Sequence, residues 1–329
     1  ALLGLHIDMP RPEDPMPPLF DRRTILTGAA ATGLAATLGL PRAGAQPAAG
    51  AGSGALTTKT VPSSGVAIPV IGLGTWITFN VGDNADALAE RTAVMQAFFE
   101  AGGGMIDSSP MYGSSQATIG HGLSQLGIPD TLFAADKVWT GSPSDGPAQI
   151  AETERLWGVP RLALMQVHNL VGWEGHLDTL AAMKAEGRIG HIGITTSHGR
   201  RHAEVAAIME SRPIDFVQLT YNLADREPEE RLLPLAAERG IAVIANRPFR
   251  RGALIDAIAG QPLPAVAAEI GAETWPQFLL KYIVSHPALT VAIPATRRVD
   301  HLRENMAAAT GPMPDASQRR QMALAFDNR

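Results

Sequence analysis

The chain has 329 residues, of which 45% are hydrophobic and 18% are charged, a composition typical of a globular protein with a large core. Its 27 basic and 32 acidic residues give a formal net charge of −5, and no basic run lies on an expected helix face. Nucleic acid and anionic membranes are therefore not favoured as partners. The absence of cysteine excludes disulfides, thiolate nucleophiles and cysteine-bound metals.

Residues 1–45 differ from the rest of the chain. Arg22 and Arg23 precede an apolar stretch without charge at 25–40, and an A-x-A pattern follows at 43–45. Together these features resemble a twin-arginine export signal. An ordinary surface helix is the alternative, although the uncharged stretch gives it no polar face. The resemblance implies the twin-arginine export machinery as a partner and a periplasmic location in a bacterium. The stretch is too short and too rich in small residues for a stable membrane anchor.

Residues 46–55, "QPAAGAGSGA", have the composition of a flexible linker. From Leu56 onward, short apolar runs alternate with amphipathic stretches, which predicts a single domain over residues 56–329. The domain begins with a short β-hairpin that turns at residues 63–65. The expected strands cover residues 71–76, 104–108, 131–138, 162–168, 191–196, 216–221, 241–246 and 290–295. The expected helices include residues 87–102, 175–188, 227–240, 274–286 and 299–309, with a short amphipathic C-terminal helix in 315–329.

Apolar strands that are joined through helices indicate a parallel sheet covered by helices. Eight such units in about 250 residues predict an α/β fold of the (β/α)8 TIM-barrel type. An open doubly wound sheet is the alternative. The dinucleotide fingerprint G-x-G-x-x-G that accompanies such sheets is not complete, because "GLGTW" at the first strand has only two of the glycines.

Four titratable residues fall at the ends of consecutive expected strands. Asp107 closes the second strand and Tyr112 lies in its loop, while Lys137 and His168 close the third and fourth strands. Each alone has an ordinary structural explanation, as a helix cap, a loop anchor, a solvated charge or a core histidine. Catalytic groups of barrels lie at the C-terminal ends of the strands. The coincidence of all four at this rim therefore favours an active site.

The four residue types fit acid–base chemistry. A lysine beside a tyrosine favours the phenolate, so Lys137 is expected to lower the pKa of Tyr112 from about 10 toward working pH. Asp107 would hold the ammonium in place. Tyr112 can then donate a proton to a substrate oxygen while His168 orients the carbonyl. Because this group of residues contains no nucleophile and no metal site, it suggests hydride transfer from a bound cofactor to a carbonyl.

Six motifs then point to a known family. "GLGTW", "IDSSPMYG", "ADKVW", "QVHNL", "VQLTYN" and "IPATRRVDHLREN" follow one another in this order. With the hairpin and the strand order, they make residues 56–309 resemble the aldo-keto reductases. The resemblance implies that Asp107, Tyr112, Lys137 and His168 are the catalytic tetrad. It also implies NADPH-dependent reduction of aldehydes or ketones to alcohols.

The resemblance assigns cofactor contacts as well. Thr195 and Thr196 replace the family's Ser-Asn pair at the nicotinamide amide, Gln218 matches its glutamine, and Asn246 replaces a stacking aromatic residue. "RPFRRGAL" resembles the segment that covers the pyrophosphate, and the last motif opens a helix toward the adenosine end. The expected cofactor contacts are Gly74, Thr75, Thr195, Thr196, Gln218, Asn246, Arg247, Pro248, Phe249, Arg251, Ala253, Thr296, Arg297, His301, Glu304 and Asn305. Arginine contacts phosphate in a bidentate manner and histidine does not, so NADPH is favoured and NADH is the alternative.

An apolar substrate pocket is expected over the tetrad. Its candidate residues are Trp76, Met111, Trp139 and Trp173, although these tryptophans can also simply fill the barrel rim. The second function that the sequence allows is an exported NADP-binding sensor or partner protein with little turnover, because the cofactor positions depart from the family pattern. The intact tetrad favours the enzyme. The nine histidines form no close pair with the spacing of metal ligands, so no metal site is expected.

Overall fold

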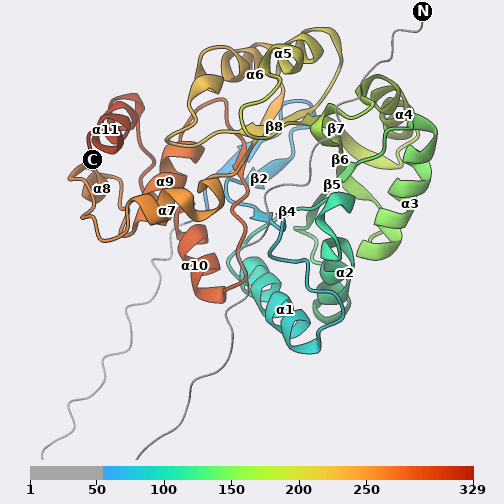
Figure 1. Ribbon diagram of the computed structural model, residues 1–329, viewed down its shortest axis with the longest axis horizontal. Coiled ribbons are helices and arrows are strands. Elements are labelled where there is room, and N and C mark those ends of the chain that lie inside the picture. The colour runs from blue at the N-terminus through green and yellow to red at the C-terminus, as the bar shows by residue number, and fades with distance from the viewer. Residues whose placement is uncertain (1–54) are drawn as a thin grey trace, which may run out of the picture. The chain divides into compact units, whose positions relative to one another are not determined.

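The computed structural model describes residues 55–329 (Figure 1). The expected export signal at 1–45 and nearly all of the expected linker at 46–55 lie outside the described residues. The described chain begins with the predicted hairpin, in which β1 (Thr58–Thr60) pairs antiparallel with β2 (Ala67–Pro69). The amide of Gly65 donates to the Val61 carbonyl at 2.9 Å, which closes the turn at the expected residues.

Eight parallel strands follow, and each pairs with its neighbours in sequence. The strands are β3 (Leu73–Gly74), β4 (Met105–Asp107), β5 (Phe133–Val138), β6 (Leu162–Val167), β7 (Ile189–Thr195), β8 (Phe216–Thr220), β9 (Ala242–Asn246) and β10 (Val291–Ala292). Parallel bridges from Ile71 to Ala292 and from Gly74 to Ala295 join the first strand to the last. This closure confirms the (β/α)8 barrel and rules out the open doubly wound sheet.

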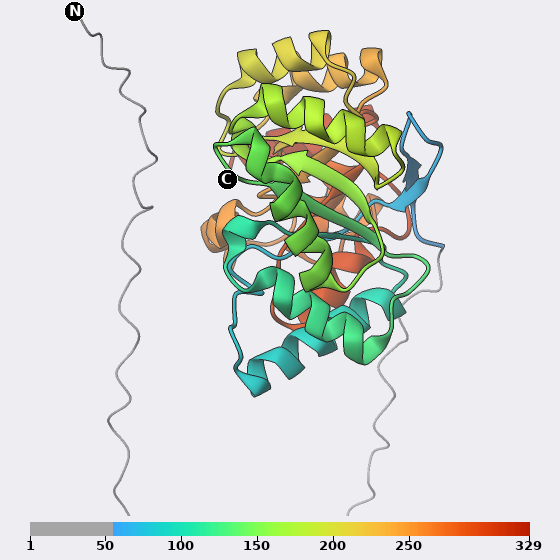
Figure 2. The ribbon, with the colours of Figure 1, turned by 90° about the vertical axis from the view of Figure 1, so that its right-hand side faces the viewer.

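Helices surround the strands (Figures 1 and 2). The helices are α1 (Ala85–Glu100), α2 (Ser115–Leu126), α3 (Gly146–Trp157), α4 (Trp173–Ala185), α5 (His202–Ser211), α6 (Leu232–Arg239), α7 (Ala253–Ala257), α8 (Val266–Glu269), α9 (Trp275–Val284), α10 (Val299–Ala307) and α11 (Ala316–Asp327). Short 3-10 turns are η1 (Pro110–Tyr112), η2 (Pro143–Asp145), η3 (His168–Leu170), η4 (Glu227–Glu229) and η5 (Arg250–Gly252). Because α1 packs against both α2 and α10, the outer layer closes where the barrel closes.

Among residues 55–329, no helix combines the length and the apolar character that a membrane crossing requires.

The strands bury both faces, as the sequence predicted. On β5, Ala134 belongs to the outer core beneath the helices, whereas Ala135 belongs to the cluster inside the barrel. The inner cluster also contains Val61 and Ile68 of the hairpin segment. Side chains of a strand alternate between its two faces, so every second residue of β5 points into the barrel. This alternation decides which polar residues meet in the interior.

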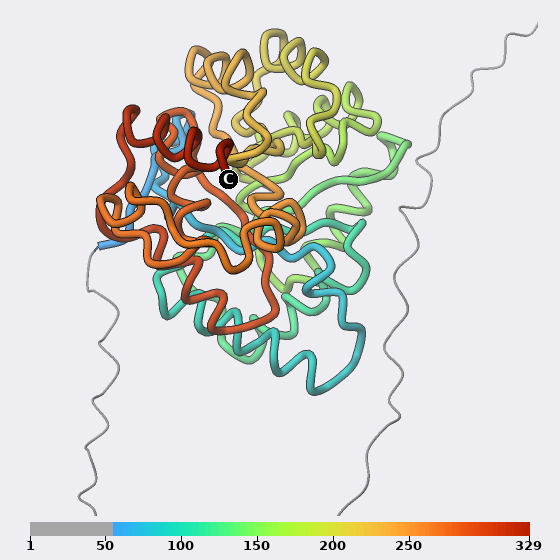
Figure 3. Tube along the Cα trace, turned by 60° about the vertical axis from the view of Figure 1, so that its left-hand side comes forward, coloured from blue at the N-terminus to red at the C-terminus, as the bar shows by residue number. Residues whose placement is uncertain are grey.

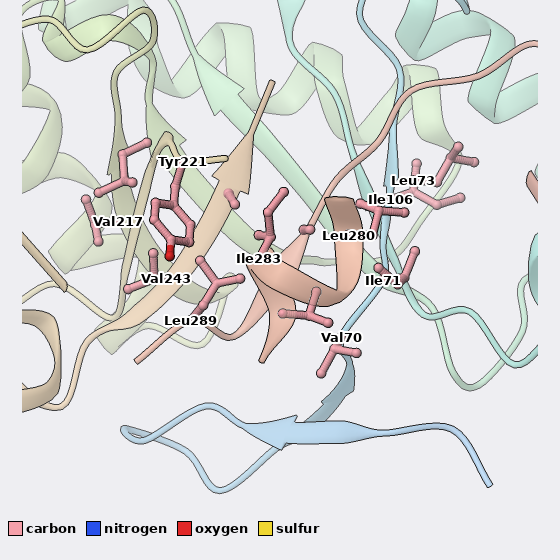
Figure 4. Close-up of a cluster of buried hydrophobic side chains, with 14 of the residues drawn as sticks. Val70, Ile71, Leu73, Ile106, Val217, Tyr221, Val243, Leu280, Ile283 and Leu289 are labelled. Carbon is pink, nitrogen blue, oxygen red and sulfur yellow. The ribbon is translucent and has the colours of Figure 1, made fainter. Parts of the chain in front are cut away.

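Helix α9 covers the seam of the barrel from outside. Figure 4 shows Leu280 and Ile283 of this helix between Val243 on one side and Ile71 on the other. The hairpin packs close to the same helix, because Lys59 Nζ donates to the carbonyl of Val284 at 2.8 Å. Figure 3 shows the N-terminal hairpin in blue beside orange and red segments of the C-terminal part of the chain. The first and last parts of the domain therefore stabilise each other.

Gly74 is required where the barrel closes. A Cβ atom at this position would lie 2.6 Å from the carbonyl oxygen of Ile293, a distance that real Cβ contacts do not reach. The amide of Gly74 donates to the Pro294 carbonyl at 3.1 Å, which draws the two strands together. Barrel closure thus explains this glycine, and its contact with a cofactor stays a prediction.

Candidate active site

The site is built around a buried ion pair between neighbouring strands. Asp107 ends β4 and Lys137 lies near the end of β5, and both have the inward orientation of Met105 and Ala135. Lys137 Nζ donates to Asp107 Oδ1 at 2.5 Å and to the carbonyl of Ser108 at 2.7 Å. Burial disfavours the ammonium, but the charges of Asp107, Tyr112 and Asp136 and the hydrogen bond to Asp107 together outweigh it, so the pKa of Lys137 is raised and the residue is charged.

Two glutamine amides complete the environment of the aspartate. Gln218 on β8 and Gln166 on β6 donate to Asp107 Oδ2 at 3.0 and 3.1 Å. All three side chains are at most 2% exposed. Because both carboxylate oxygens accept hydrogen bonds, the buried charge of Asp107 is stabilised from three other strands.

Tyr112 lies beside this pair in η1, the turn after β4. Lys137 Nζ is 5.2 Å from the centre of its ring. Burial raises the pKa of Tyr112 to about 12, although Lys137 acts in the opposite direction. The expected lowering of the Tyr112 pKa toward working pH is therefore wrong in direction. The cost of burying a phenolate exceeds its attraction to one ammonium, whose charge Asp107 already neutralises. Tyr112 is protonated at neutral pH, as a proton donor must be.

His168 joins the group from the end of β6. Its ring packs edge-on against Tyr112, with ring centres 5.7 Å apart, and its Nδ1 lies 2.7 Å from Ser109 Oγ. Burial, with a contribution from Lys137, holds the pKa of His168 well below its ordinary value, so the imidazole is neutral. The structure thus brings together all four residues that the sequence placed at this rim.

Backbone strain marks the same end of the barrel. Eight described non-glycine residues have positive φ angles, and all of them follow the C-terminal ends of β3, β6, β7 or β9. Such conformations are costly for residues with a side chain and gather at functional sites. These residues are Ile77, Asn169, Leu170, His198, Arg201, Arg247, Arg250 and Arg251. This observation indicates the same rim as the motifs do, and it is independent of them.

The residues expected at the nicotinamide amide form hydrogen bonds with one another. Asn246 Nδ2 donates to the carbonyl of Thr196 at 2.9 Å, and its Oδ1 accepts from Thr220 Oγ1 at 2.7 Å. Thr195 Oγ1 accepts from the amide of Asn169 at 3.1 Å, which anchors the loop after β6. The side-chain amide of Gln218 donates to Asp107 Oδ2. Their contacts with a cofactor stay predictions.

The residues expected at the phosphates and the adenosine lie on two further rim segments. Arg251 in the loop after β9 reaches the loop after β3, where its guanidinium lies 4.4 Å from the centre of the Trp76 ring. Thr296 Oγ1 accepts from the amide of Arg298 at 3.1 Å just before α10. Arg297 is exposed on the same segment. Further along, His301 is exposed, Glu304 is half-buried and Asn305 is buried.

The expected pocket residues divide into two groups. Met111 precedes Tyr112 in η1, and Trp139, which is 41% exposed, lies with its ring centre 6.5 Å from that of His168. Trp173 instead begins α4, and its Nε1 donates to Glu204 on α5 at 3.2 Å. Trp173 therefore bonds to a neighbouring helix, and its place in a substrate pocket stays a prediction.

Sequence reasoning missed Gln166, Ser109 and Asp136. Gln166 lies two residues before His168, and Ser109 lies two residues after Asp107. Because side chains of a strand alternate between its faces, the position of Gln166 relative to His168 is the signal that could have indicated it. Asp136 lies on the outer face of β5, opposite to Lys137, and its Oδ2 accepts from Nε1 of Trp157 on α3 at 2.8 Å. Burial raises its pKa to about 6. Among the described residues, no group of three or more His, Asp or Glu side chains could hold a metal ion.

Comparison with known proteins relates the chain to one family. A model of the aldo/keto reductase family matches residues 70–321. The chain is 27% identical over 266 residues to the methylglyoxal reductase YeaE of Escherichia coli, and the match covers 76% of this chain and 88% of that protein. It is 32% identical over 175 residues to an uncharacterized oxidoreductase of Schizosaccharomyces pombe. That match covers 51% of this chain and spans about half of the yeast protein, 54% of its length.

Solved structures show the same architecture. An aldo-keto reductase from Klebsiella pneumoniae in complex with NADPH superposes with a TM-score of 0.69 and 22% sequence identity, over 83% of this chain and 95% of that chain. At this identity the likeness concerns the fold. The family match covers most of the chain and includes every strand of the barrel. The chain belongs to the aldo/keto reductase family and is an oxidoreductase of that type.

Proposed function

We propose that the protein reduces aldehydes or ketones to alcohols with NADPH, and that Tyr112 is the proton donor. The observation that carries this proposal is the convergence of Tyr112, His168 and the buried Asp107–Lys137 pair at one strained rim. NADPH supplies the hydride for the carbonyl carbon when it is bound. The protein's own groups have to bind the carbonyl, orient it and deliver one proton to its oxygen.

Each polar group has a distinct part in the proton transfer. Tyr112 Oη gives its proton to the carbonyl oxygen, and the ammonium of Lys137 stabilises the phenolate that remains. Asp107 keeps Lys137 charged in a buried environment. His168 is neutral and orients the carbonyl oxygen beside Tyr112. A tyrosine with a raised pKa remains protonated until an oxygen of higher basicity forms next to it.

The basic residues and backbone amides at the rim suit a dinucleotide that carries an extra phosphate. Arg251 and Arg297 are exposed on the two expected phosphate segments. Helix α10 begins at Val299 without a side-chain cap from Arg298; the amide of His301 donates to Asp300 Oδ1 at 2.9 Å, which leaves the amides of Val299 and Asp300 for an anion. The K. pneumoniae relative was solved with NADPH, which supports the same cofactor here. Arginine suits the 2′-phosphate of NADPH, so we expect tighter binding of NADPH than of NADH.

The first experiment titrates the purified chain with NADPH and with NADH, and then adds an aromatic aldehyde while reduced-nicotinamide absorbance is followed. We expect tight NADPH binding and a steady loss of absorbance. Methylglyoxal belongs in the substrate panel because of the YeaE relative. Tight binding without turnover of any carbonyl compound would contradict the reductase and favour the NADP-binding sensor. No binding of either cofactor would contradict both functions.

We also propose that residues 1–45 direct export through the twin-arginine route, which would place the protein in the periplasm. Arg22 and Arg23 and the uncharged stretch at 25–40 support this proposal. Fusion of residues 1–45 to a reporter that is active only after export would test it in bacteria. We expect exported reporter with the native segment and none after replacement of both arginines by lysine. Equal export of the two fusions would refute the proposal.

A further inference from the structure

Ser109 contacts His168 at the centre of the site. It follows the end of β4 by two residues and caps η1, and its side chain is fully buried. Ser109 Oγ lies 2.7 Å from Nδ1 of His168 and 3.1 Å from the amide nitrogen of Met111. The direction of the bond to His168 decides which imidazole nitrogen carries the proton, and the other partners of Ser109 determine that direction.

A serine hydroxyl has one hydrogen to donate and two lone pairs that accept. The amide of Met111 can only donate, so it uses one lone pair of Ser109 Oγ. Within residues 55–329, no acceptor other than His168 Nδ1 forms a hydrogen bond with this oxygen. If Nδ1 carried the proton, the buried hydroxyl hydrogen would have no partner. The hydroxyl therefore donates to Nδ1.

The consequence follows from the chemistry of imidazole. His168 is 4% exposed and lies near the charged Lys137, so it is neutral. A neutral imidazole whose Nδ1 accepts a hydrogen bond carries its proton on Nε2. With Nδ1 turned toward Ser109, Nε2 lies on the other edge of the ring. His168 therefore offers a donor, and not a lone pair, at that edge.

We propose that Ser109 is a positioning residue that fixes His168 as the Nε2–H tautomer, so that Tyr112 and His168 present two donors to the same carbonyl oxygen. The part that concerns the carbonyl rests on the proposed reductase function. Two donors stabilise an oxygen on which negative charge develops. In the other tautomer, the Nε2 lone pair would repel that oxygen and compete for the proton of Tyr112.

Nuclear magnetic resonance of the full chain with ¹⁵N-labelled histidine reads the tautomer directly. His168→Gln assigns the signal. In the unmodified protein we expect a protonated-type shift for Nε2 and an unprotonated-type shift for Nδ1. In Ser109→Ala we expect a mixture of the two tautomers. A proton on Nδ1 in the unmodified protein overturns the proposal, as does an unchanged Nε2–H signal in Ser109→Ala.

Ser115→Ala is the matched control. Ser115 is also fully buried, and its hydroxyl bonds Ser108 Oγ at 2.9 Å and not the histidine. We expect no change of tautomer in this variant. With an aldehyde substrate, Ser109→Ala should lower kcat by about 3- to 10-fold, the size of one net hydrogen bond, with unchanged NADPH affinity. Because the tautomer is read without substrate, absence of turnover in the unmodified protein would refute the reductase function and leave the test of Ser109 intact.

Discussion

Lys137 Nζ lies 2.5 Å from Asp107 Oδ1, and neither side chain is more than 2% exposed. The ammonium also donates to the carbonyl of Ser108, and the second carboxylate oxygen accepts from two glutamines. This ion pair connects neighbouring strands of the barrel and holds the charge beside Tyr112. Its stability and its chemistry can therefore be tested separately.

Removing one partner of this pair should destabilise the protein strongly. Lys137→Met leaves the carboxylate of Asp107 buried without its cation, so we expect a loss of about 3–5 kcal/mol in the free energy of unfolding, measured by urea denaturation. The double variant Asp107→Asn with Lys137→Met should lose less. Arg155→Met removes an exposed pair with Glu152 and should have no measurable effect. Equal stability of Lys137→Met and the unmodified protein would contradict the buried ion pair.

Loss of the Tyr112 hydroxyl should separate binding from turnover. In Tyr112→Phe we expect kcat for aldehyde reduction to fall by about 10²- to 10⁴-fold, since the proton donor is gone. Affinity for NADPH, measured by fluorescence titration, should not change. Tyr282→Phe is the control, because the hydroxyl of Tyr282 donates to Glu229 Oε1 at 2.9 Å and not to a member of the tetrad. Unchanged turnover in Tyr112→Phe would remove Tyr112 from the mechanism.

The pH profile should show that burial dominates the chemistry of Tyr112. Burial raises the pKa of Tyr112 to about 12, so the proton donor is lost only as the pH approaches that value. His168 has a pKa well below its ordinary value because it is buried, so it becomes charged only at acidic pH. Initial rates of reduction should therefore give a kcat/KM that is flat from about pH 7 to 9. A single ionisation in the kcat/KM profile within that range would mean that the charge of Lys137 affects the pKa of Tyr112 more than burial does.

A methyl group at the barrel seam should weaken the fold. In Gly74→Ala the new Cβ would lie 2.6 Å from the carbonyl oxygen of Ile293, so the first and last strands must separate. We expect a loss of about 1–3 kcal/mol in the free energy of unfolding, measured by denaturant titration. Gly141→Ala is the control, since a Cβ there meets no atom within 4 Å. Similar losses of unfolding free energy in both variants would show that close packing at the seam does not cause the destabilisation by Gly74→Ala.

The sequence alone determined the order of the strands and the position of the tetrad. Apolar runs joined by helical stretches indicate parallel strands, and the C-terminal ends of parallel strands meet at one edge. That reasoning placed Asp107, Tyr112, Lys137 and His168 at one rim before any distance was known. It holds because chain direction and the twofold repeat of a strand are local properties that can be counted along the chain.

Only the tertiary structure decided how these residues act on one another. The amides that reach Asp107 come from β6 and β8, and the Ser109–His168 contact joins residues 59 positions apart. The pKa of Tyr112 depends on the balance between burial and the ammonium of Lys137, and the sequence contains the charge but not the degree of burial. The same holds for the hydrogen bond from Trp173 to Glu204 on α5, which joins residues 31 positions apart. Distances across the barrel and exclusion of water arise only when the whole chain is packed, so no local pattern encodes them.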